Sequence, residues 1–378
     1  MALLDMARKK NVYLEVGHVN YHHRDSADRD EKIVRKYCRE HGIKFHKKDF
    51  VDESLTGNFQ HKAREFRYRY FNDLCKKNNL DEVLIAHNMD DFIETYYMQK
   101  DKGLGVSYYG IKKRNKLYGA NVYRPLLDSE KKDLKEYCDK HNIVYGIDES
   151  NLKDEYTRNR IRHSKVEKMS SADKKKLYEK IIKENTAREN RIIEVRDYLL
   201  NNTLDPKEFR KIKNLKDFMH ENYPGKSDKS IDEYIRQLCD CDTVIKGNTY
   251  TLSRDYGHIN TYINFEEYSY TFKDYESLFE GKYECFKIRK KGTSFEGVTV
   301  DKKDFPITIR NNKPGDKIAM NYGNKKINRF FIDKKIPYCE REKWPVVVNR
   351  NGEIILVPGI GCDKYHYSNK HNLFVIKL

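Results

Sequence analysis

The stretch from Asp81 to Thr95 restricts the fold of this chain more than any other. Val83 to Ala86 is a short apolar run, typical of a buried parallel strand, and the residues from Met89 onward have helical spacing. His87 and Asn88 would then form a tight turn between the strand and the helix. Ligands of open parallel sheets bind beyond the carboxyl ends of the strands, so we expect the chemistry of the protein at this turn.

Four polar side chains would project from this turn toward a ligand: His87, Asp90, Asp91 and Glu94. Asp91 and Glu94 are three residues apart, and Asp90 and Glu94 are four apart, so the carboxylates share one helical face. Like charges this close repel unless a cation joins them, and an amine or Mg²⁺ would serve. The alternative is an ordinary acidic first turn favoured by the helix dipole, with a histidine in the turn.

Helices and strands alternate along the first part of the chain. We expect helices over 2–9, 26–41, 58–77 and 129–141, and strands over 11–19, 43–50 and 144–145. Such alternation indicates βαβ units and a parallel sheet. A long charged helix from Ser171 to about Asn201 then opens an all-helical middle domain, which short β segments from Thr243 would close with a hairpin.

The last third of the chain changes to strands, turns and one helix. Residues 307–310 are strand-like, 313–316 form a turn, and Asn351-Gly352 is the signature of a hairpin. Residues 325–332 have the spacing of an amphipathic helix that would turn Lys325, Lys326 and Arg329 outward. These three side chains would form a phosphate-binding face or would simply be solvated.

A length of 378 residues suggests two or three domains, and the net charge of +16 indicates a polyanionic partner. Lysine, asparagine and tyrosine are abundant throughout, so part of the charge would be ordinary solvated surface.

No apolar run approaches the roughly 20 residues that cross a bilayer, and no signal peptide is recognisable. We therefore expect a cytoplasmic protein without a membrane partner. The eight scattered cysteines lack a Cys-x-x-Cys pair, which favours reduced thiols.

Cationic side chains gather again between residues 156 and 163. Arg158, Arg160, Arg162 and His163 surround Asn159, a combination suited to phosphates and a base edge. The alternative is a basic helix start that faces water.

Taken together, these segments resemble the tRNA(Ile)-lysidine synthetase family of the PP-loop ATP pyrophosphatase superfamily. The matching residues span most of the chain: Gly17 to Asn20 with Arg24, Asp30 and Glu31; Asn58 with Ala63, Arg64, Arg67 and Tyr68; Ala86 and His87 with Asp91 to Thr95; Arg124 to Leu126; Asp148, Ser150 and Asn151; Arg158 to His163; Lys313 to Lys317; and Lys325-Lys326 to Ile336-Pro337 with Arg341 and Pro345.

The resemblance implies an α/β fold in three domains. Residues 1–165 would form a doubly wound parallel sheet of the PP-loop ATPase type, 166–280 a mainly helical tRNA-binding middle domain, and 281–378 a small α+β tRNA-binding C-terminal domain. The family's first strand and its Ser-Gly-Gly-x-Asp-Ser phosphate loop are missing, because Met1 to Asp5 look like the helix that follows that loop. Either Met1 is an internal methionine of a longer polypeptide, which the intact downstream motifs favour, or the chain is a remnant without activity.

The family joins the side-chain amine of free L-lysine to C2 of the wobble cytidine in a tRNA(Ile) with a CAU anticodon. ATP first adenylates the C2 oxygen and releases diphosphate, AMP becomes the leaving group, and the neutral amine then attacks. The resemblance therefore implies a ligase that forms a C–N bond and uses ATP and Mg²⁺. A second copy of the chain, in a homodimer, is a further candidate partner.

Site residues follow from the same resemblance. Asp91 and Glu94 would bind lysine's ammonium groups near His87, Asp5 would lie near ATP or Mg²⁺, and His18, Val19 and Asn20 would flank the adenine. The expected tRNA contacts are Arg64, Arg67, Arg158, Asn159 and Arg162, together with Lys325, Lys326 and Arg329.

Two other functions fit parts of the pattern. A non-catalytic tRNA-binding remnant would explain the missing phosphate loop. Another PP-loop enzyme that modifies tRNA would share the ATP domain, but the related thiolases need paired cysteines, which this chain lacks.

Overall fold

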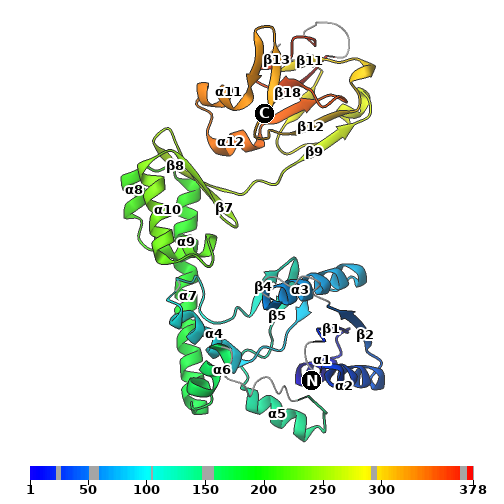
Figure 1. Ribbon diagram of the computed structural model, residues 1–378, viewed down its shortest axis with the longest axis vertical. Coiled ribbons are helices and arrows are strands. Elements are labelled where there is room, and N and C mark those ends of the chain that lie inside the picture. Colours follow the sequence, from blue (N-terminus) through cyan, green and yellow to red (C-terminus); the bar gives the residue numbers. More distant parts are fainter. Residues whose placement is uncertain are drawn as a thin grey trace. The chain divides into compact units, whose positions relative to one another are not determined.

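The computed structural model describes residues 1–22, 27–50, 59–103, 105–146, 157–290, 296–366 and 373–377. They form two compact units, Met1–Arg191 and Ile192–Leu378 (Figure 1). Along the described ranges, every helix is too short or too polar to cross a bilayer. The predicted domain boundaries near residues 165 and 280 stay predictions.

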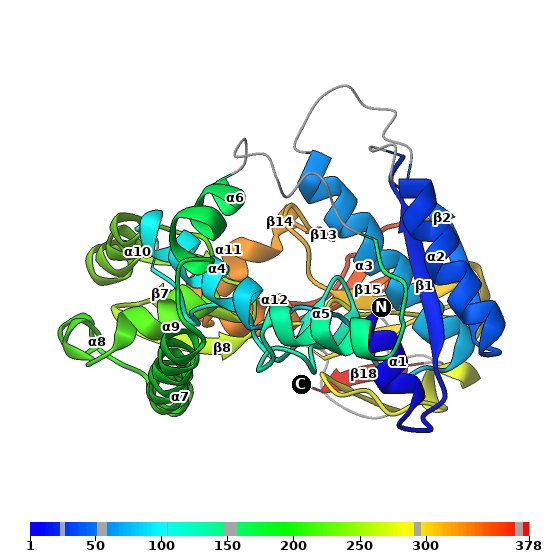
Figure 2. The ribbon, with the colours of Figure 1, turned by 90° about the horizontal axis from the view of Figure 1, so that it is seen from below.

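The first unit opens with a βαβ arrangement. After α1 (Ala2–Arg8), β1 (Glu15–Asn20) and β2 (Lys44–Asp49) pair in parallel, with Glu15 opposite Lys44. The helix between them, α2 (Ala27–Glu40), packs along both strands (Figure 2). The predicted helices and parallel pairing are confirmed here, although β1 begins four residues later than the strand that we expected from Asn11.

The second sheet of this unit contains the strand that precedes the acidic turn. Here β3 (Val83–Leu84) is parallel to β5 (Ala120–Tyr123), which pairs antiparallel with β4 (Arg114–Leu117). The expectation of a buried strand is wrong, because Leu84 is 36% exposed and β3 pairs on one side only within the described residues. The strand predicted at residues 144–145 is also wrong, since these residues form no ladder.

The helix α3 (Phe59–Asn78) packs against both small sheets. Its approach to β1 depends on Gly17, where an added Cβ atom would lie 3.0 Å from the Phe71 ring and 3.1 Å from Leu74. A side chain at residue 17 would push α3 away from β1. The glycine therefore brings α3, with Arg64 and Arg67 on it, next to the end of β1.

The core of the first unit fixes the helix that carries the acids. Phe92 and Ile93 of α4 (Met89–Asp101) are fully buried with Ile161 and Ile181. Ile161 ends α6 (Thr157–Ile161), which continues into a π-helical turn over Arg162–Val166. Contacts between α4 and α6 therefore bring the acidic turn and the cationic segment together, although they are more than 60 residues apart.

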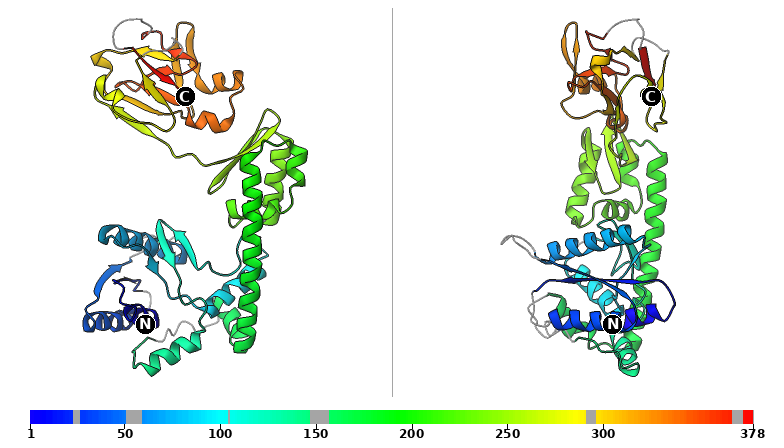
Figure 3. Two further views of the ribbon diagram at one scale, coloured as in Figure 1. Left: turned by 180° about the vertical axis from the view of Figure 1, so that it is seen from behind. Right: turned by 90° about the vertical axis from the view of Figure 1, so that its right-hand side faces the viewer.

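The predicted long helix is confirmed as α7 (Ser171–Asn201), which is continuous (Figure 3). Its residue Ile181 belongs to the core of the first unit, whereas Ile192, Val195 and Leu199 belong to the first apolar cluster of the second unit. α5 (Lys131–Lys140) lies between α4 and α6 in the sequence.

The second unit begins with helices and a small sheet. The helices are α8 (Pro206–Lys211), α9 (Leu215–Asn222) and α10 (Asp228–Asp240), and the strands are β6 (Thr243–Lys246), β7 (Tyr250–Asp255) and β8 (His258–Ile263). The three strands form an antiparallel sheet in sequence order, so the expected hairpin is confirmed and extended by one strand.

The rest of the second unit is an α+β arrangement. A five-stranded sheet has the order β17-β16-β15-β12-β9, a three-stranded sheet has the order β10-β18-β11, and β13 and β14 form a separate hairpin. The bounds are β9 (Ser269–Phe272), β10 (Lys287–Arg289), β11 (Gly297–Thr299), β12 (Ile307–Asn311), β13 (Lys317–Met320), β14 (Gly323–Lys326), α11 (Ile327–Asp333), α12 (Tyr338–Lys343), β15 (Pro345–Val348), β16 (Ile354–Val357), β17 (Gly361–Cys362) and β18 (Leu373–Lys377).

One predicted element of this region is partly wrong. Lys325 and Lys326 lie in strand β14 and not in a helix, which begins only at Ile327. The reason is the turn at Gly323, whose φ of +115° closes the β13–β14 hairpin and gives the two lysines backbone partners in β13. Pairing between strands overrides the helical spacing here.

A half-buried histidine in this region makes stability depend on pH. His366 Nδ1 lies 2.6 Å from Asp363 Oδ1, and His366 Nε2 lies 3.2 Å from Asp304 Oδ1. The hydrogen bond with Asp363, assisted by Asp304 and opposed by burial, raises the pKa of His366 above its ordinary 6.5. Its stabilising contribution is therefore complete below pH 6.5 and is lost as the pH rises through the folded-state pKa.

We expect His366→Gln to lower the melting temperature more at about pH 6 than at about pH 9, because only the protonated ring balances the two buried carboxylates. The measurement is thermal unfolding of both proteins at both pH values. His258→Gln, at an exposed position on β8, is the matched control. An equal loss at both pH values would show that the ring contributes packing alone.

Candidate active site

A capping box fixes the acidic turn at the start of α4. The Asn88 side chain accepts a hydrogen bond from the Asp91 N–H at 3.1 Å, and the Asp91 carboxylate accepts one from the Asn88 N–H at 3.0 Å. Asp91 Oδ2 is thereby committed to the backbone, which leaves Oδ1 to face other groups. Glu94 follows one turn later on the same face of the helix.

The chain itself supplies the cations that join these acids. Arg158 Nη2 lies 2.7 Å from Asp91 Oδ1, and Arg158 Nε lies 2.7 Å from Glu94 Oε2. Arg162 forms a fork on Glu94, with Nε 2.6 Å from Oε1 and Nη2 3.1 Å from Oε2. Two guanidinium groups thus lie between the carboxylates in this structure, and the expected amine or Mg²⁺ at this position stays a prediction.

The four groups differ in their exposure to water. The side chains of Glu94 and Arg162 are 2% and 12% exposed, whereas that of Arg158 is 37% exposed. Burial raises the pKa of Asp91, and Arg158 acts in the opposite direction. Arg162 is therefore an interior partner of Glu94, while Arg158 is the part of the cluster that meets solvent.

Asp90 points away from these groups. Its carboxylate accepts a hydrogen bond from the Lys131 N–H at the start of α5, at 2.8 Å, and forms an ion pair with Lys174 of α7. The prediction that Asp90 projects toward a ligand is wrong, because these contacts with α5 and α7 hold its side chain in the interior. It ties α4 to the two helices instead.

His87 is hydrogen-bonded to a buried arginine. Arg124, directly after β5, donates from Nε to His87 Nδ1 at 3.0 Å and from Nη1 to Lys112 O and Asn115 Oδ1, both at 2.7 Å. The Arg124 residue is 1% exposed. Burial of the ring and the nearby positive charges, led by Arg124 and Arg158, lower the pKa of His87 to about 3. The imidazole is thus neutral at physiological pH.

These groups line a cleft of about 310 Å³ with a strongly cationic wall. The wall includes Arg64, His87, Lys112, Asn115, Arg124 and Arg158. Such a lining suits the phosphates of a nucleotide or of RNA. Arg64, His87 and Arg158 are among the site residues predicted from the sequence, whereas Lys112, Asn115 and Arg124 are not. Arg124 belongs to a segment that carries the family resemblance, Arg124 to Leu126, but no role was assigned to it.

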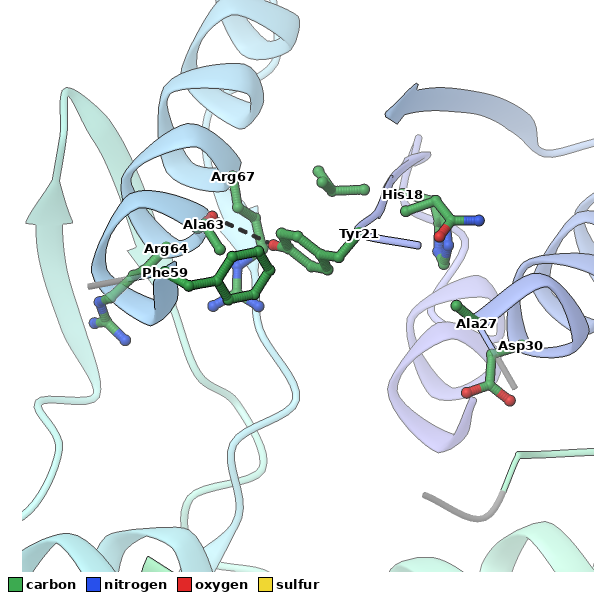
Figure 4. A pocket seen from close by; sticks show the side chains of 10 residues that line it. His18, Tyr21, Ala27, Asp30, Phe59, Ala63, Arg64 and Arg67 are labelled. Carbon is green, nitrogen blue, oxygen red and sulfur yellow. Dashed lines mark hydrogen bonds between the residues drawn. The ribbon is translucent and has the colours of Figure 1, made fainter. Parts of the chain in front are cut away.

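A second cleft, of about 340 Å³, lies at the end of β1 (Figure 4). Its lining includes the three residues predicted to flank adenine, together with aromatic and cationic residues: His18, Val19, Asn20, Tyr21, Asp30, Phe59, Arg64 and Arg67. Figure 4 shows the Tyr21 ring beside Phe59 and Arg67, with its hydroxyl donating to Ala63 O. Arg64 lines both clefts, so α3 forms part of each wall.

Several side chains that line the second cleft are held by contacts with other residues of the protein. The Asn20 amide donates to Asp28 and Glu31 at 2.9 and 3.0 Å. Burial lowers the pKa of His18, which keeps its ring neutral. On α3, Arg67 lies over the face of Tyr68, with 5.3 Å from its guanidinium carbon to the ring centroid. The Arg67 Nε atom is buried with no hydrogen-bond partner among the described residues.

Two further predicted site residues have internal partners. Asn159 is buried, and Arg162 Nη1 lies 3.5 Å from its Oδ1 atom. Asp5 is buried as well, and its carboxylate binds Arg8 at 3.0 Å, Lys9 at 2.8 Å and the hydroxyls of Tyr37 and Tyr137 at 2.6 Å each. Two cations and two hydroxyls already satisfy Asp5, so it does not fit as a magnesium ligand here. No carboxylate, histidine or cysteine cluster within the described ranges offers a metal site.

The predicted basic face of the C-terminal region belongs to the second unit. Lys326 and Arg329 are exposed, whereas Lys325 is half-buried and has its Nζ atom 5.5 Å from the centroid of the Phe330 ring. Arg329 forms an exposed ion pair with Asp333 at 3.1 Å. Other matching residues, Arg24, Asn58, Asp148, Ser150 and Asn151, lie outside the described residues.

Comparison with known proteins places both ends of the chain in named domain families. A PP-loop domain model matches residues 1–169, and a model described as the TilS substrate C-terminal domain matches residues 307–376. The first match contains both clefts and the acid–arginine cluster. Together, the two matches support an α/β domain of the PP-loop ATPase type followed by a C-terminal domain of the TilS type.

Relatives named tRNA(Ile)-lysidine synthase match at different lengths. The one from Ureaplasma parvum is 46% identical over 168 residues, which cover 43% of this chain and 50% of that protein. The one from Bacillus subtilis is 26% identical over 93% of this chain and 84% of its own length. The one from Mycoplasma mycoides subsp. mycoides is 31% identical over 91% of this chain and 89% of its own length. Because this last match covers nearly all of both proteins, the chain belongs to the tRNA(Ile)-lysidine synthase family.

Proposed function

We propose that this chain joins L-lysine to C2 of the wobble cytidine in tRNA(Ile) with a CAU anticodon, through an adenylated tRNA and with release of AMP and diphosphate. The observation that carries the proposal is the meeting of acids and arginines beside a cationic cleft. The family match supports the same reaction along nearly the whole chain.

The nucleotide would occupy the cleft at the end of β1. His18, Val19 and Asn20 would flank the adenine, and Arg64, which lines both clefts, would contact a phosphate. We further propose that the sheet of this domain is doubly wound, as in PP-loop ATPases. Support comes from β1 and β3, each of which pairs on one side only within the described residues. Mg²⁺ remains an expectation of the family, and no step here depends on it.

Lysine would bind where Arg158 now bridges the acids. An ammonium group needs the same carboxylate oxygens, Asp91 Oδ1 and Glu94 Oε2, that Arg158 holds at 2.7 Å. Arg158 is the exposed member of the cluster, so its guanidinium can move away from these oxygens or share them with the ammonium group. Arg162 would keep both of its hydrogen bonds to Glu94. The acids would then hold the incoming amine, and Arg158 would face the RNA.

The target cytidine has to leave the anticodon stack to reach such a cleft. In a single-stranded loop this costs little, and base-modifying enzymes bind extruded bases in this way. Arg67, Asn159 and the basic residues of the second unit, Lys325, Lys326 and Arg329, are the other proposed RNA contacts. The second unit would then give specificity for one tRNA, since the reacting cytidine is not unique to it.

The deciding experiment measures AMP and lysidine formation by the purified chain with ATP, L-lysine and tRNA(Ile) transcript. We expect both products with the CAU transcript and none when the wobble cytidine is replaced by uridine. Binding of the transcript without either product would support the tRNA-binding remnant instead. Diphosphate release without AMP or lysidine would show adenylation without lysine transfer, and would count against Asp91 and Glu94 as the lysine site.

A further inference from the structure

The contact between Arg124 and His87 determines which ring nitrogen of His87 carries a proton. Arginine keeps its charge in proteins, and its Nε–H is always a donor. Because Arg124 Nε lies 3.0 Å from His87 Nδ1, the Nδ1 atom has to be the acceptor. A proton on Nδ1 would place two donors against each other. The neutral ring therefore carries its proton on Nε2.

Arg124 is held in place to make this contact. Its hydrogen-bond acceptors among the described residues are neutral and include His87 Nδ1, Lys112 O and Asn115 Oδ1. Its backbone N–H donates to Lys113 O at 2.9 Å, which anchors the residue beyond β5. A buried guanidinium without a carboxylate is costly, so this arrangement points to a task in the cleft that the charge serves.

The Nε2 side of the ring is the side that can meet a ligand. His87 lines the 310 Å³ cleft, and its Nε2 atom has no hydrogen-bond partner among the described residues. The charged groups that lower the pKa of His87 are cationic and come from three elements: Arg64 and Arg67 of α3, Arg124 after β5, and Arg158 of α6. They disfavour a second proton on the ring.

We propose that His87 acts as a fixed hydrogen-bond donor from Nε2 to an oxygen of the substrate that gains negative charge, and that Arg124 is the positioning residue that enforces this tautomer. The inference rests on the proposed function for the identity of that oxygen, on the pyrimidine or the AMP phosphate. It gives His87 a role opposite to that of a general base. With Nδ1 blocked by Arg124 and Nε2 already protonated, His87 accepts no proton from the amine.

The first test reads the tautomer directly and needs no turnover. In the full chain labelled with ¹⁵N-histidine, His87 is assigned by the signal that disappears in His87→Gln. We expect the ¹⁵N shifts of a neutral ring protonated at Nε2, unchanged from about pH 8 to about pH 5. Shifts of the Nδ1-protonated form, or titration near the ordinary histidine pKa, would overturn the proposal.

The second test separates a donor from a base by substitution. Glutamine can place an N–H near the position of Nε2 but cannot act as a base, whereas alanine does neither. We expect His87→Gln to keep AMP formation within about 10-fold of the unsubstituted chain and His87→Ala to lose about 100-fold, the usual effect of removing one such donor. Equal loss in both variants would refute the donor role. His258→Gln, on the second unit, is the control.

Arg124→Met tests the positioning residue. Methionine fills similar space without the charge or the Nε–H, and we expect the His87 signal to begin titrating in the range of ordinary histidines. A His87 signal unchanged in Arg124→Met would overturn the role of Arg124. If this variant does not fold, the signal of the unsubstituted chain still decides the tautomer. Absence of AMP with the unsubstituted chain would instead count against the proposed function, since the NMR result is independent of turnover.

Discussion

Replacing Glu94 with glutamine is expected to lower the free energy of unfolding of the first unit by about 3 to 5 kcal/mol, the usual cost of removing one partner from a buried ion pair. Glu94 accepts from Arg158 and Arg162 through both carboxylate oxygens, and its side chain is 2% exposed. Glutamine keeps the shape of the side chain but supplies one acceptor oxygen and no charge. The Arg162 guanidinium, 12% exposed, would remain buried beside a neutral amide.

The measurement is urea unfolding of the full chain, followed by a signal from the first unit. The matched control is Glu65→Gln on α3, where Glu65 pairs with Arg69 at 2.7 Å in an exposed i, i+4 arrangement. This control should change stability by no more than about 0.5 kcal/mol, because water already screens the pair. A loss for Glu94→Gln as small as that of the control would mean that water reaches the cluster and that its arginines are not buried partners.

The second large effect concerns lysine. We expect Asp91→Asn to lower kcat/KM for lysine by about 100-fold, equivalent to about 2.7 kcal/mol, within the range for removing one member of a buried charge pair. Asparagine can still accept from the Asn88 N–H, so the capping box and the start of α4 should persist. The ammonium of lysine, however, would lose one of the two carboxylates proposed to bind it.

Lysine incorporation into tRNA at limiting and saturating lysine measures this effect, and tRNA binding is measured separately. The dissociation constant for tRNA should change by less than about 3-fold, because Asp91 contacts no phosphate in the proposal. Asp101→Asn, at the other end of α4 in an exposed pair with Lys165, should leave both quantities unchanged. Unchanged turnover of Asp91→Asn at limiting lysine would falsify the assignment.

Much of the helical structure could be predicted from local patterns alone. The helices over α2, α3, α4 and α7 were expected within a few residues, because each carries its spacing of apolar residues in one continuous stretch. The short strands were less predictable. β3 is exposed on one side and only two residues long, and β14 takes in Lys325 and Lys326, because strand pairing depends on residues elsewhere in the chain.

The candidate site, too, could be predicted only in part from the sequence. The residues of the acidic turn and the cationic segment could be selected from the sequence, since both patterns are compact. The contact between the two segments could not be predicted from the sequence, because Arg158 and Arg162 reach Glu94 only through the packing of α6 on α4. The same is true of Arg124, whose partner His87 lies 37 residues earlier in the chain.

By itself, the sequence determined which side chains are present for chemistry: two acids one helical turn apart, a histidine before them, and arginines downstream. Only the tertiary structure decided their charge state and partners. It placed a guanidinium on each acid, turned Asp90 toward α5 and α7, and set Arg124 against His87 Nδ1. The physical reason is that hydrogen bonding and the balance of buried charge depend on distances of a few ångströms across the fold, which spacing along the chain does not specify.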